Sequence, residues 1–413
     1  MTASLSVRRM IDPIRRVGQR GVLLAVLGLV AVTGCGTGAG DSEDVQYAPV
    51  FCVQPSPTGH DLLGRLAFVS GVETWTTAFD PSGPAVAHRV DGHWSVVRLP
   101  RPRAKFSAVY DVSGIGDVWA VGAAYPNGSD DRSTALVEHW SAKRWQIVPT
   151  PHLAVQKVGL RAVVEISRNN VWAVGGYGNR AGPAFPLRML AEHWNGHRWR
   201  VVPMPTPGGS ENGLETLAWD SPTSLWTVGS LDDGQGFLEH WNGHRWSISQ
   251  TPDVPGSATF DAVLATGTTD VWIAGTITRP GGLHTTALFE HWDGHTWTRV
   301  PAPATPDADP SLTALAARVP QDIWAAGSIR SHGHPYTQPL VMHWDGSHWS
   351  IAATPHFRIP APVGSPDPEW ASAAFDGIAI QGGGRPWVVG YRPSGHGTQE
   401  EPLVAASCHA SAA

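Results

Sequence analysis

The chain has 413 residues, of which 42% are hydrophobic and 15% charged, and its formal net charge is −6. On length alone it could hold about two or three domains of ordinary size. The acidic balance excludes the extended basic surface that neutralises phosphates, so we expect no nucleic-acid partner.

The first 34 residues have the pattern of a secretory signal. Five arginines precede an apolar stretch over residues 22–32, which is too short to span a bilayer. The stretch runs into Val-Thr-Gly-Cys35, which resembles the lipobox of bacterial lipoproteins. That resemblance implies diacylation of Cys35, a flexible tether over residues 35–46 and anchoring on the extracytoplasmic face of the cell membrane. Ordinary signal cleavage that leaves Cys35 free is the alternative.

Seven short apolar runs, each built around a tryptophan, follow at a mean spacing of about 52 residues. In six of them a glycine stands three residues after the tryptophan. A period of this length is typical of repeat folds such as propellers and solenoids. We therefore expect a single repeat domain over residues 47–413. The repeated tryptophans are Trp75, Trp119, Trp172, Trp226, Trp272, Trp324 and Trp387.

The third unit shows the repeat most fully. Residues 160–166, 171–175, 189–194 and 198–202 are short β-rich runs, and an Asn-Gly pair separates the last two. Such runs, joined by turn residues and interrupted by proline, predict a four-stranded antiparallel meander. We name its strands A to D in chain order. The fold class is therefore an all-β, seven-bladed β-propeller with four-stranded antiparallel blades.

The two ends of the chain complement each other. The last unit has a C strand over residues 403–408 but no D strand, whereas residues 48–55 look like a D strand that precedes the first unit. We therefore predict that the N-terminal strand completes the last blade, which also protects an open sheet edge. Cys52 and Cys408 then lie on neighbouring strands. They either stay unpaired or form a disulfide that closes the ring, and the repeat register favours the disulfide.

Parts of the unit resemble the kelch repeat. Residues 171–176 are similar to its hydrophobic run and glycine pair, and residues 193–204 to its later aromatic pair and proline. The similarity covers residues 64–407 and implies a kelch-type propeller like the central domain of galactose oxidase. Most copies carry one glycine instead of two, and tryptophan replaces the usual tyrosine in strand C. Because kelch propellers have many functions, the resemblance implies a fold and not an activity.

Histidines recur at one position of strand C. Equivalent positions on different blades are far apart around a ring, so these imidazoles cannot converge on one metal ion. We expect each to make a hydrogen bond within its own blade, beside the tryptophans. We expect no metal site, no cofactor and no catalytic residue. The histidines are His88, His139, His193, His240, His291 and His343.

A glycan-active enzyme, a sialidase-like hydrolase or lyase with its site at the channel mouth, is the alternative. Residues 293–297 resemble the Asp box of sialidases, and residues 357–360, with Arg358, match their arginine motif. In that family the arginine motif precedes the first Asp box, whereas here it follows the sixth hairpin. A sialidase also needs a tyrosine nucleophile beside carboxylates. No tyrosine lies in a recognisable match; the candidates are Tyr47, Tyr110, Tyr125, Tyr177, Tyr336 and Tyr391.

The connections of the repeat differ in length and variability. A–B and C–D turns are short and repetitive, whereas B–C and D–A connections are long and differ in every unit. In a propeller the long connections open on one face, and loops on a rigid scaffold commonly carry binding residues. The binding-face candidates are Asp130, Asp131, Arg132, Arg180, Asp232, Asp233, Arg279, His284, Arg330, His332, His334, Arg358, Arg392 and His396.

These observations predict a monomeric, lipid-anchored, extracytoplasmic propeller that binds a protein or glycan of the cell envelope without catalysis. A purely structural role in an envelope complex is a further alternative. The membrane is expected to contact the protein only through its lipid anchor.

Overall fold

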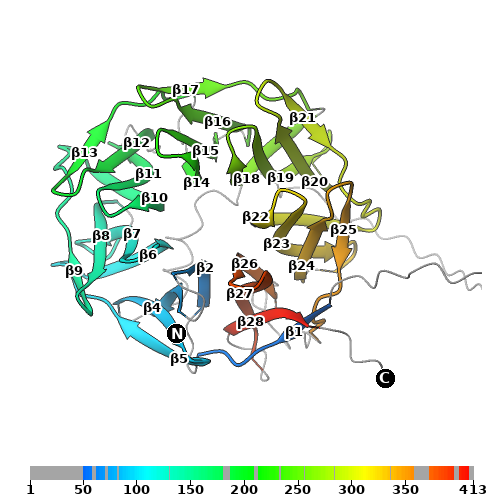
Figure 1. Cartoon of the computed structure of the whole chain (residues 1–413), viewed down its shortest axis with the longest axis horizontal. Coiled ribbons are helices and arrows are strands. Elements are labelled where there is room, and N and C mark those ends of the chain that lie inside the picture. Colours follow the sequence, from blue (N-terminus) through cyan, green and yellow to red (C-terminus); the bar gives the residue numbers. More distant parts are fainter. Residues whose placement is uncertain are drawn as a thin grey trace, which may run out of the picture.

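The computed structural model is a closed ring of seven four-stranded antiparallel sheets (Figure 1). This confirms the predicted all-β, seven-bladed propeller. The described residues contain no helix long and apolar enough to span a bilayer. The predicted signal peptide, Cys35 and the predicted tether lie outside the described part of the chain. The structure describes residues 50–408 except 58–61, 70–72, 81–82, 130, 180–186, 209–212, 232–233, 255, 283, 335, 358–371 and 395–399.

Within each blade the strands follow one another from the centre of the ring to its periphery (Figure 1). The A strands are β2 (Leu62–Phe68), β6 (Phe106–Ser113), β10 (Lys157–Ser167), β14 (Gly213–Ser221), β18 (Ser257–Gly267), β22 (Ala308–Val319) and β26 (Ala374–Gln381). The B strands are β3 (Thr74–Asp80), β7 (Val118–Tyr125), β11 (Asn170–Gly178), β15 (Ser224–Ser230), β19 (Asp270–Thr278), β23 (Asp322–Ser331) and β27 (Arg385–Pro393).

The outer half of each blade is a hairpin, except in the last blade. The C strands are β4 (Gly83–Val90), β8 (Thr134–Ser141), β12 (Leu187–Trp194), β16 (Gly236–Trp241), β20 (Thr285–Trp292), β24 (Gln338–Trp344) and β28 (Glu400–Cys408). The D strands are β5 (His93–Arg98), β9 (Arg144–Ile147), β13 (Trp199–Val202), β17 (Trp246–Ser249), β21 (Trp297–Val300), β25 (Trp349–Ala352) and, from the N-terminal side, β1 (Val50–Val53).

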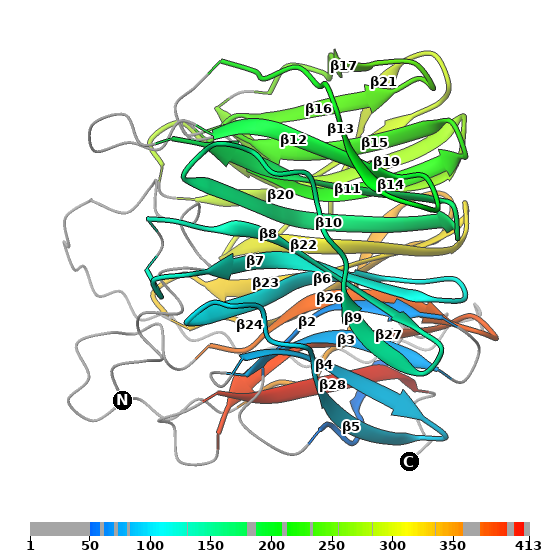
Figure 2. The same cartoon turned by 90° about the vertical axis from the view of Figure 1, so that its left-hand side faces the viewer.

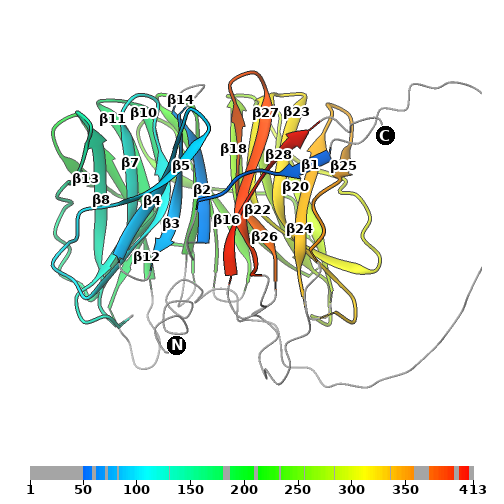
Figure 3. The same ribbon diagram turned by 90° about the horizontal axis from the view of Figure 1, so that it is seen from below.

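The strands of all blades run between the two faces of the ring, which is seen edge-on in Figures 2 and 3. Because neighbouring strands are antiparallel, the A–B and C–D turns share one face, the short-turn face. The B–C and D–A connections share the opposite face, the loop face. Turn chemistry explains the short-turn face: in blade three, the side chain of Asn195 accepts hydrogen bonds from the backbone N–H groups of His197 and Arg198, and Gly196 has φ +90°.

The repeated glycine stands opposite a β-bulge in strand A. Gly175 pairs with Leu160, and the register then shifts between Leu160 and Ala162. At this point strand B approaches strand A so closely that a Cβ on Gly175 would lie 2.0 Å from the carbonyl oxygen of Gly159. The same arrangement recurs at the equivalent glycines, Gly122, Gly229, Gly275, Gly327 and Gly390. The Trp-x-x-Gly spacing is therefore a steric requirement of the bulge.

Replacing Gly175 with alanine should destabilise the protein by about 3 kcal/mol or more, because backbone must move to admit the methyl group. Gly176→Ala is the matched control, since its added Cβ meets its nearest atom at 3.5 Å, an ordinary contact. Urea denaturation of both variants measures the difference. Equal midpoints for the two alanine variants would contradict the steric explanation.

Tryptophans fill the interfaces between neighbouring blades. The B-strand residue Trp119 lies against Trp194 and Trp199 of the next blade, with ring centroids 5.3 and 5.5 Å apart. The same set of contacts joins Trp75 to Trp140 and Trp145. Because each B-strand ring is buried by the hairpin of the following blade, the tryptophan repeat specifies how blades pack on one another.

The repeated histidines belong to this packing. His88 stacks on Trp75 of its own blade at 3.7 Å between centroids, and its Nε2 lies 2.9 Å from the carboxylate of Glu73. The indole N–H of Trp75 donates to the same carboxylate. Equivalent contacts join His193 to Asn170, His240 to Ser224, His291 to Asp270 and His343 to Asp322. The predicted hydrogen bond within the blade is confirmed for these five histidines, whereas Nε2 of His139 lies 3.5 Å from the carboxylate of Asp117 and makes no hydrogen bond among the described residues.

Four glutamates of strand C are completely buried. They are Glu138, Glu192, Glu239 and Glu290, and each side chain is 0% exposed. Among the described residues, none of their carboxylate oxygens has a hydrogen-bond partner, although Oε1 of Glu290 lies 3.8 Å from Nη2 of Arg299, whose charge partly opposes the effect of burial. Burial raises the pKa of Glu138 and Glu239 to about 8, and that of Glu192 and Glu290 to about 7. Below about pH 7 these four carboxyl groups therefore favour the protonated, uncharged state in the folded protein.

The N-terminal strand closes the ring as predicted. Strand β1 pairs antiparallel with β28, with Val50 opposite Cys408. A disulfide joins Cys52 to Cys408 across this pair, with Cα atoms 5.8 Å apart. The backbone N–H of Phe51 also donates to Ala353 of blade six. Strand β1 therefore completes one blade and contacts the preceding one.

Candidate functional site

The A-strand bulges place polar residues around the axis of the ring, and we call these the channel residues. At each bulge one or two residues have no partner in strand B, and their side chains are half-buried. Arg65 shows their direction: its guanidinium donates to the carbonyl oxygens of Thr313 at 3.1 Å and Glu215 at 3.4 Å, in blades that do not neighbour its own. The bulged residues are Arg65, Tyr110, Arg161, Glu215, Asp261, Thr313 and Asp376.

The channel residues contact one another within the ring. The guanidinium of Arg161 lies over the ring of Tyr110, 4.5 Å from its centroid, and the phenol of Tyr110 is 2.6 Å from that of Tyr125. Burial raises the pKa of Asp111 to about 6, although the charge of Arg65 opposes this change. The channel wall therefore carries both signs of charge in a partly desolvated setting.

Eight of the fourteen binding-face candidates are described. Arg279, His284, Arg330, His332 and His334 stand at B–C connections of blades five and six, and Asp131 and Arg132 at that of blade two. Arg392 lies at the end of β27 and pairs with Glu401 at 3.0 Å. The candidates that lie outside the described residues are Asp130, Arg180, Asp232, Asp233, Arg358 and His396.

One depression on the loop face lies between blades two and three, with a volume of about 340 Å³. Its lining includes Arg132, His152 and Asn179, which come from B–C and D–A connections. The side chain of Asn179 accepts the backbone N–H of Gln156 at 2.9 Å and so joins two of these connections. Arg132 is the one candidate residue in this depression.

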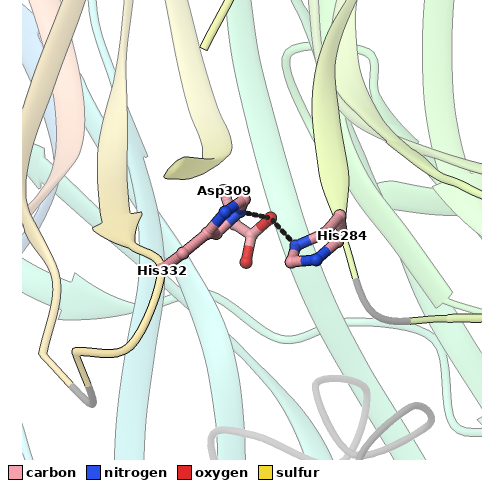
Figure 4. Close-up of side chains that lie close together, drawn as sticks. All are labelled: His284, Asp309 and His332. Atoms are coloured by element: carbon pink, nitrogen blue, oxygen red, sulfur yellow. Dashed lines mark hydrogen bonds and ion pairs between the residues drawn. The ribbon is translucent and has the colours of Figure 1, made fainter. Parts of the chain in front are cut away.

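A second depression, of about 330 Å³, lies between blades five and six. The carboxylate of Asp309 lines it, and two candidate side chains, His284 and His332, approach this carboxylate (Figure 4). Asp309 Oδ1 is 3.3 Å from His284 Nδ1 and 3.2 Å from His332 Nε2, while Oδ2 is 3.2 Å from Arg330 Nη2. The structure thus brings together three residues that were predicted only as members of one face.

Asp309 is well placed for ionic contacts because its side chain is only 9% exposed. Burial acts to raise its pKa, but hydrogen bonds from the Thr285 backbone, Arg330, His332 and His284 outweigh this effect. The net result is a pKa below the ordinary value for aspartate. The carboxylate is therefore held in its charged form.

Sequence reasoning missed Asp309 and, apart from Tyr110, which it named only as a candidate sialidase nucleophile, the channel residues, although signals for both exist. Each bulged residue interrupts an apolar A strand and, in five blades, stands 14 positions before the repeated glycine. Pairing outward from the Leu312–Gly327 pair places Asp309 opposite Arg330. The approach of His284 from the neighbouring blade has no such signal.

Comparisons with known proteins support the fold alone. No protein-family model and no curated protein matches the chain. A structure titled "YCF48 bound to D1 peptide" is similar at 14% identity and TM-score 0.50, covering 88% of this chain and 98% of that one. YCF48 from Cyanidioschyzon merolae is similar at 14% identity and TM-score 0.52, covering 87% and 98%. A fucose-specific lectin from Aleuria aurantia matches at 13% identity and TM-score 0.42, covering 74% and 100%.

Proposed function

We propose that this protein is an exported lipoprotein, anchored through Cys35, whose propeller binds a protein or glycan of the cell envelope without catalysis. The contrast between the two faces carries this proposal. Repeated turns build the short-turn face, whereas the loop face has unique connections and both depressions described above. Binding residues concentrate on such variable loops when a rigid scaffold supports them.

The path of the chain agrees with a lipid anchor. Strand β1 begins at Val50 on the short-turn face, beside Cys408 at the end of β28. A tether that joins Cys35 to this point has a maximum reach of about 50 Å. It would attach the ring at its short-turn face and leave the loop face accessible to partners.

One of the similar structures is that of YCF48 bound to a D1 peptide. This is support for a binding role, because the same architecture can present a peptide-binding surface. A kelch-type origin of the repeat is also part of our proposal. A glycan-active enzyme is the alternative; among its candidate nucleophiles, Tyr110 lies 2.6 Å from the phenol of Tyr125 and beside the guanidinium of Arg161.

Site-specific photo-crosslinking tests the assignment of the binding face. Probes at Arg132, Arg279 and His334 on the loop face should capture the same envelope partner in cells, whereas probes at His197 and His244 on the short-turn face should not. Charge reversal at Arg132 and Arg279 should weaken capture by about tenfold or more if either is an interface hot spot.

Two results would count against the proposal. Capture from the short-turn face alone would mean that we have assigned partner binding to the wrong face. Turnover of glycosides by the wild-type protein, lost on substitution of channel residues such as Glu215 or Asp261, would favour an enzyme. A glycan array probed with the same variants distinguishes glycan from protein partners.

A further inference from the structure

We infer that His284, Asp309 and His332 form a binding site for a zinc-class divalent cation at the junction of blades five and six. The ligand atoms are His284 Nδ1, Asp309 Oδ1 and His332 Nε2, which lie within 4.8 Å of one another. Imidazole nitrogens with one carboxylate oxygen are a donor set that suits zinc and its neighbours. The inference does not depend on the proposed partner or on lipid anchoring.

The spacing of the ligand atoms fits tetrahedral coordination. Metal–ligand distances of about 2.0–2.2 Å place neighbouring ligand atoms about 3.3–3.6 Å apart in a tetrahedron. Two of the three edges already have nearly this length, because Asp309 Oδ1 is 3.3 Å from His284 Nδ1 and 3.2 Å from His332 Nε2. The third edge joins the two imidazole nitrogens. It can reach this length by rotation of the His284 side chain, which is 47% exposed.

Asp309 is positioned before any ion arrives. The backbone N–H of Thr285 donates to Oδ1 at 3.0 Å, and Arg330 occupies Oδ2 at 3.2 Å. These contacts turn Oδ1 toward both imidazoles and fix the carboxylate as a single-oxygen ligand. The positive charge of Arg330 lowers the affinity for a cation, so we expect binding in the micromolar range and not tighter.

The backbone around the site is built on strands. His284 immediately precedes β20, Asp309 is the second residue of β22, and His332 immediately follows β23. A bound ion would therefore link two neighbouring blades at the loop face. Three protein ligands leave one tetrahedral position open to solvent, where a water molecule or a group from a binding partner can complete the coordination.

Zinc binding by the full, folded chain tests the inference directly. After treatment with EDTA, calorimetric titration with ZnCl₂ should show one saturable site, whereas MgCl₂ should show none because magnesium requires oxygen ligands. The double variant His284→Ala/His332→Ala should bind zinc about 100-fold more weakly or not at all. Co²⁺ should give the visible absorption of a tetrahedral complex with the wild type only.

His295→Ala is the matched control, because His295 is an exposed histidine on the short-turn face of blade five. It should bind zinc like the wild type. Circular dichroism without metal should show that all variants fold, so that lost binding reports the site. Equal zinc affinities for the wild type and the double variant, or no saturable binding by the wild type, would overturn the inference and leave the cluster as two imidazoles hydrogen-bonded to a carboxylate.

Discussion

Replacing Glu138, Glu192, Glu239 and Glu290 with glutamine should raise stability at alkaline pH and leave it nearly unchanged below about pH 4. Their folded pKa values of about 7 to 8 exceed the ordinary 4.5 because burial penalises the charged form. Raising the pKa of one group by one corresponds to about 1.4 kcal/mol of free energy. The free-energy penalties of four such groups add up to about the whole stability of an average protein, so local rearrangement must relieve part of this penalty. At pH 9 we expect the free energy of unfolding of the quadruple variant to exceed that of the wild type by about 5 kcal/mol or more.

The direction follows from proton linkage. The folded state binds more protons than the unfolded state between about pH 4.5 and 8, so the glutamates stabilise the fold below this window and lose that effect as pH rises through it. Burial lowers the pKa of His88, His139, His193 and His240. The stability that these histidines contribute is therefore lost as the pH falls below 6.5, where the unfolded state binds more protons. The glutamate effect is therefore unopposed by these histidines from pH 6.5 to 8.

Urea denaturation at pH 6.5 and pH 9 measures this effect. The wild type should lose stability over this interval, and the quadruple glutamine variant should lose much less. Asp91→Asn is a suitable control, since Asp91 is exposed in a C–D turn. A wild type that becomes more stable toward pH 9 would show that the buried carboxylates do not behave as we predict.

Substitution of both Cys52 and Cys408 by serine should cost about 5 kcal/mol. The disulfide links residues that are 356 positions apart, and loop entropy makes such a link worth about that much. The loss should also free β1, because this strand has only four residues and its side chains at Cys52 and Val53 are exposed. Chemical denaturation under oxidising conditions measures the loss, and limited proteolysis near residue 50 measures the release of the strand.

Reduction provides the internal control for this prediction. Wild-type protein treated with dithiothreitol should behave like the double serine variant, and the same treatment should leave the variant unchanged. A double variant as stable as the oxidised wild type would mean that pairing of β1 with β28 and its contact with Ala353 suffice to close the ring.

The fold could be predicted from the sequence because its determinants are local and repeated. The glycine that follows six of the seven repeated tryptophans indicates the A-strand bulge, as Gly175 does, and the His-Trp hairpin indicates the packing on the preceding blade. The place of β1 could also be predicted, since a blade that lacks a strand and a strand that lacks a blade stand at opposite ends of the chain.

For the candidate sites, only the face of the ring on which they lie could be predicted. B–C and D–A connections have no common pattern, so the repeat register does not extend into them. The meeting of His284 with Asp309 depends on how far two unrelated connections extend across a blade junction. The channel residues were overlooked for another reason: a polar residue such as Arg161 within an apolar A strand indicates a bulge only when the pairing partner is considered.

The pairing of the first strand with the last has a consequence for biosynthesis. Strand β1 is the first part of the ring to leave the ribosome, yet its partner β28 ends at Cys408, near the end of the 413-residue chain. Every other blade can assemble from contiguous sequence while translation continues, whereas the last blade must wait until β28 has been synthesised. Such a high contact order makes closure the slow step of maturation. Until closure, β1 has no partner strand and the outer edge of β28 is unpaired.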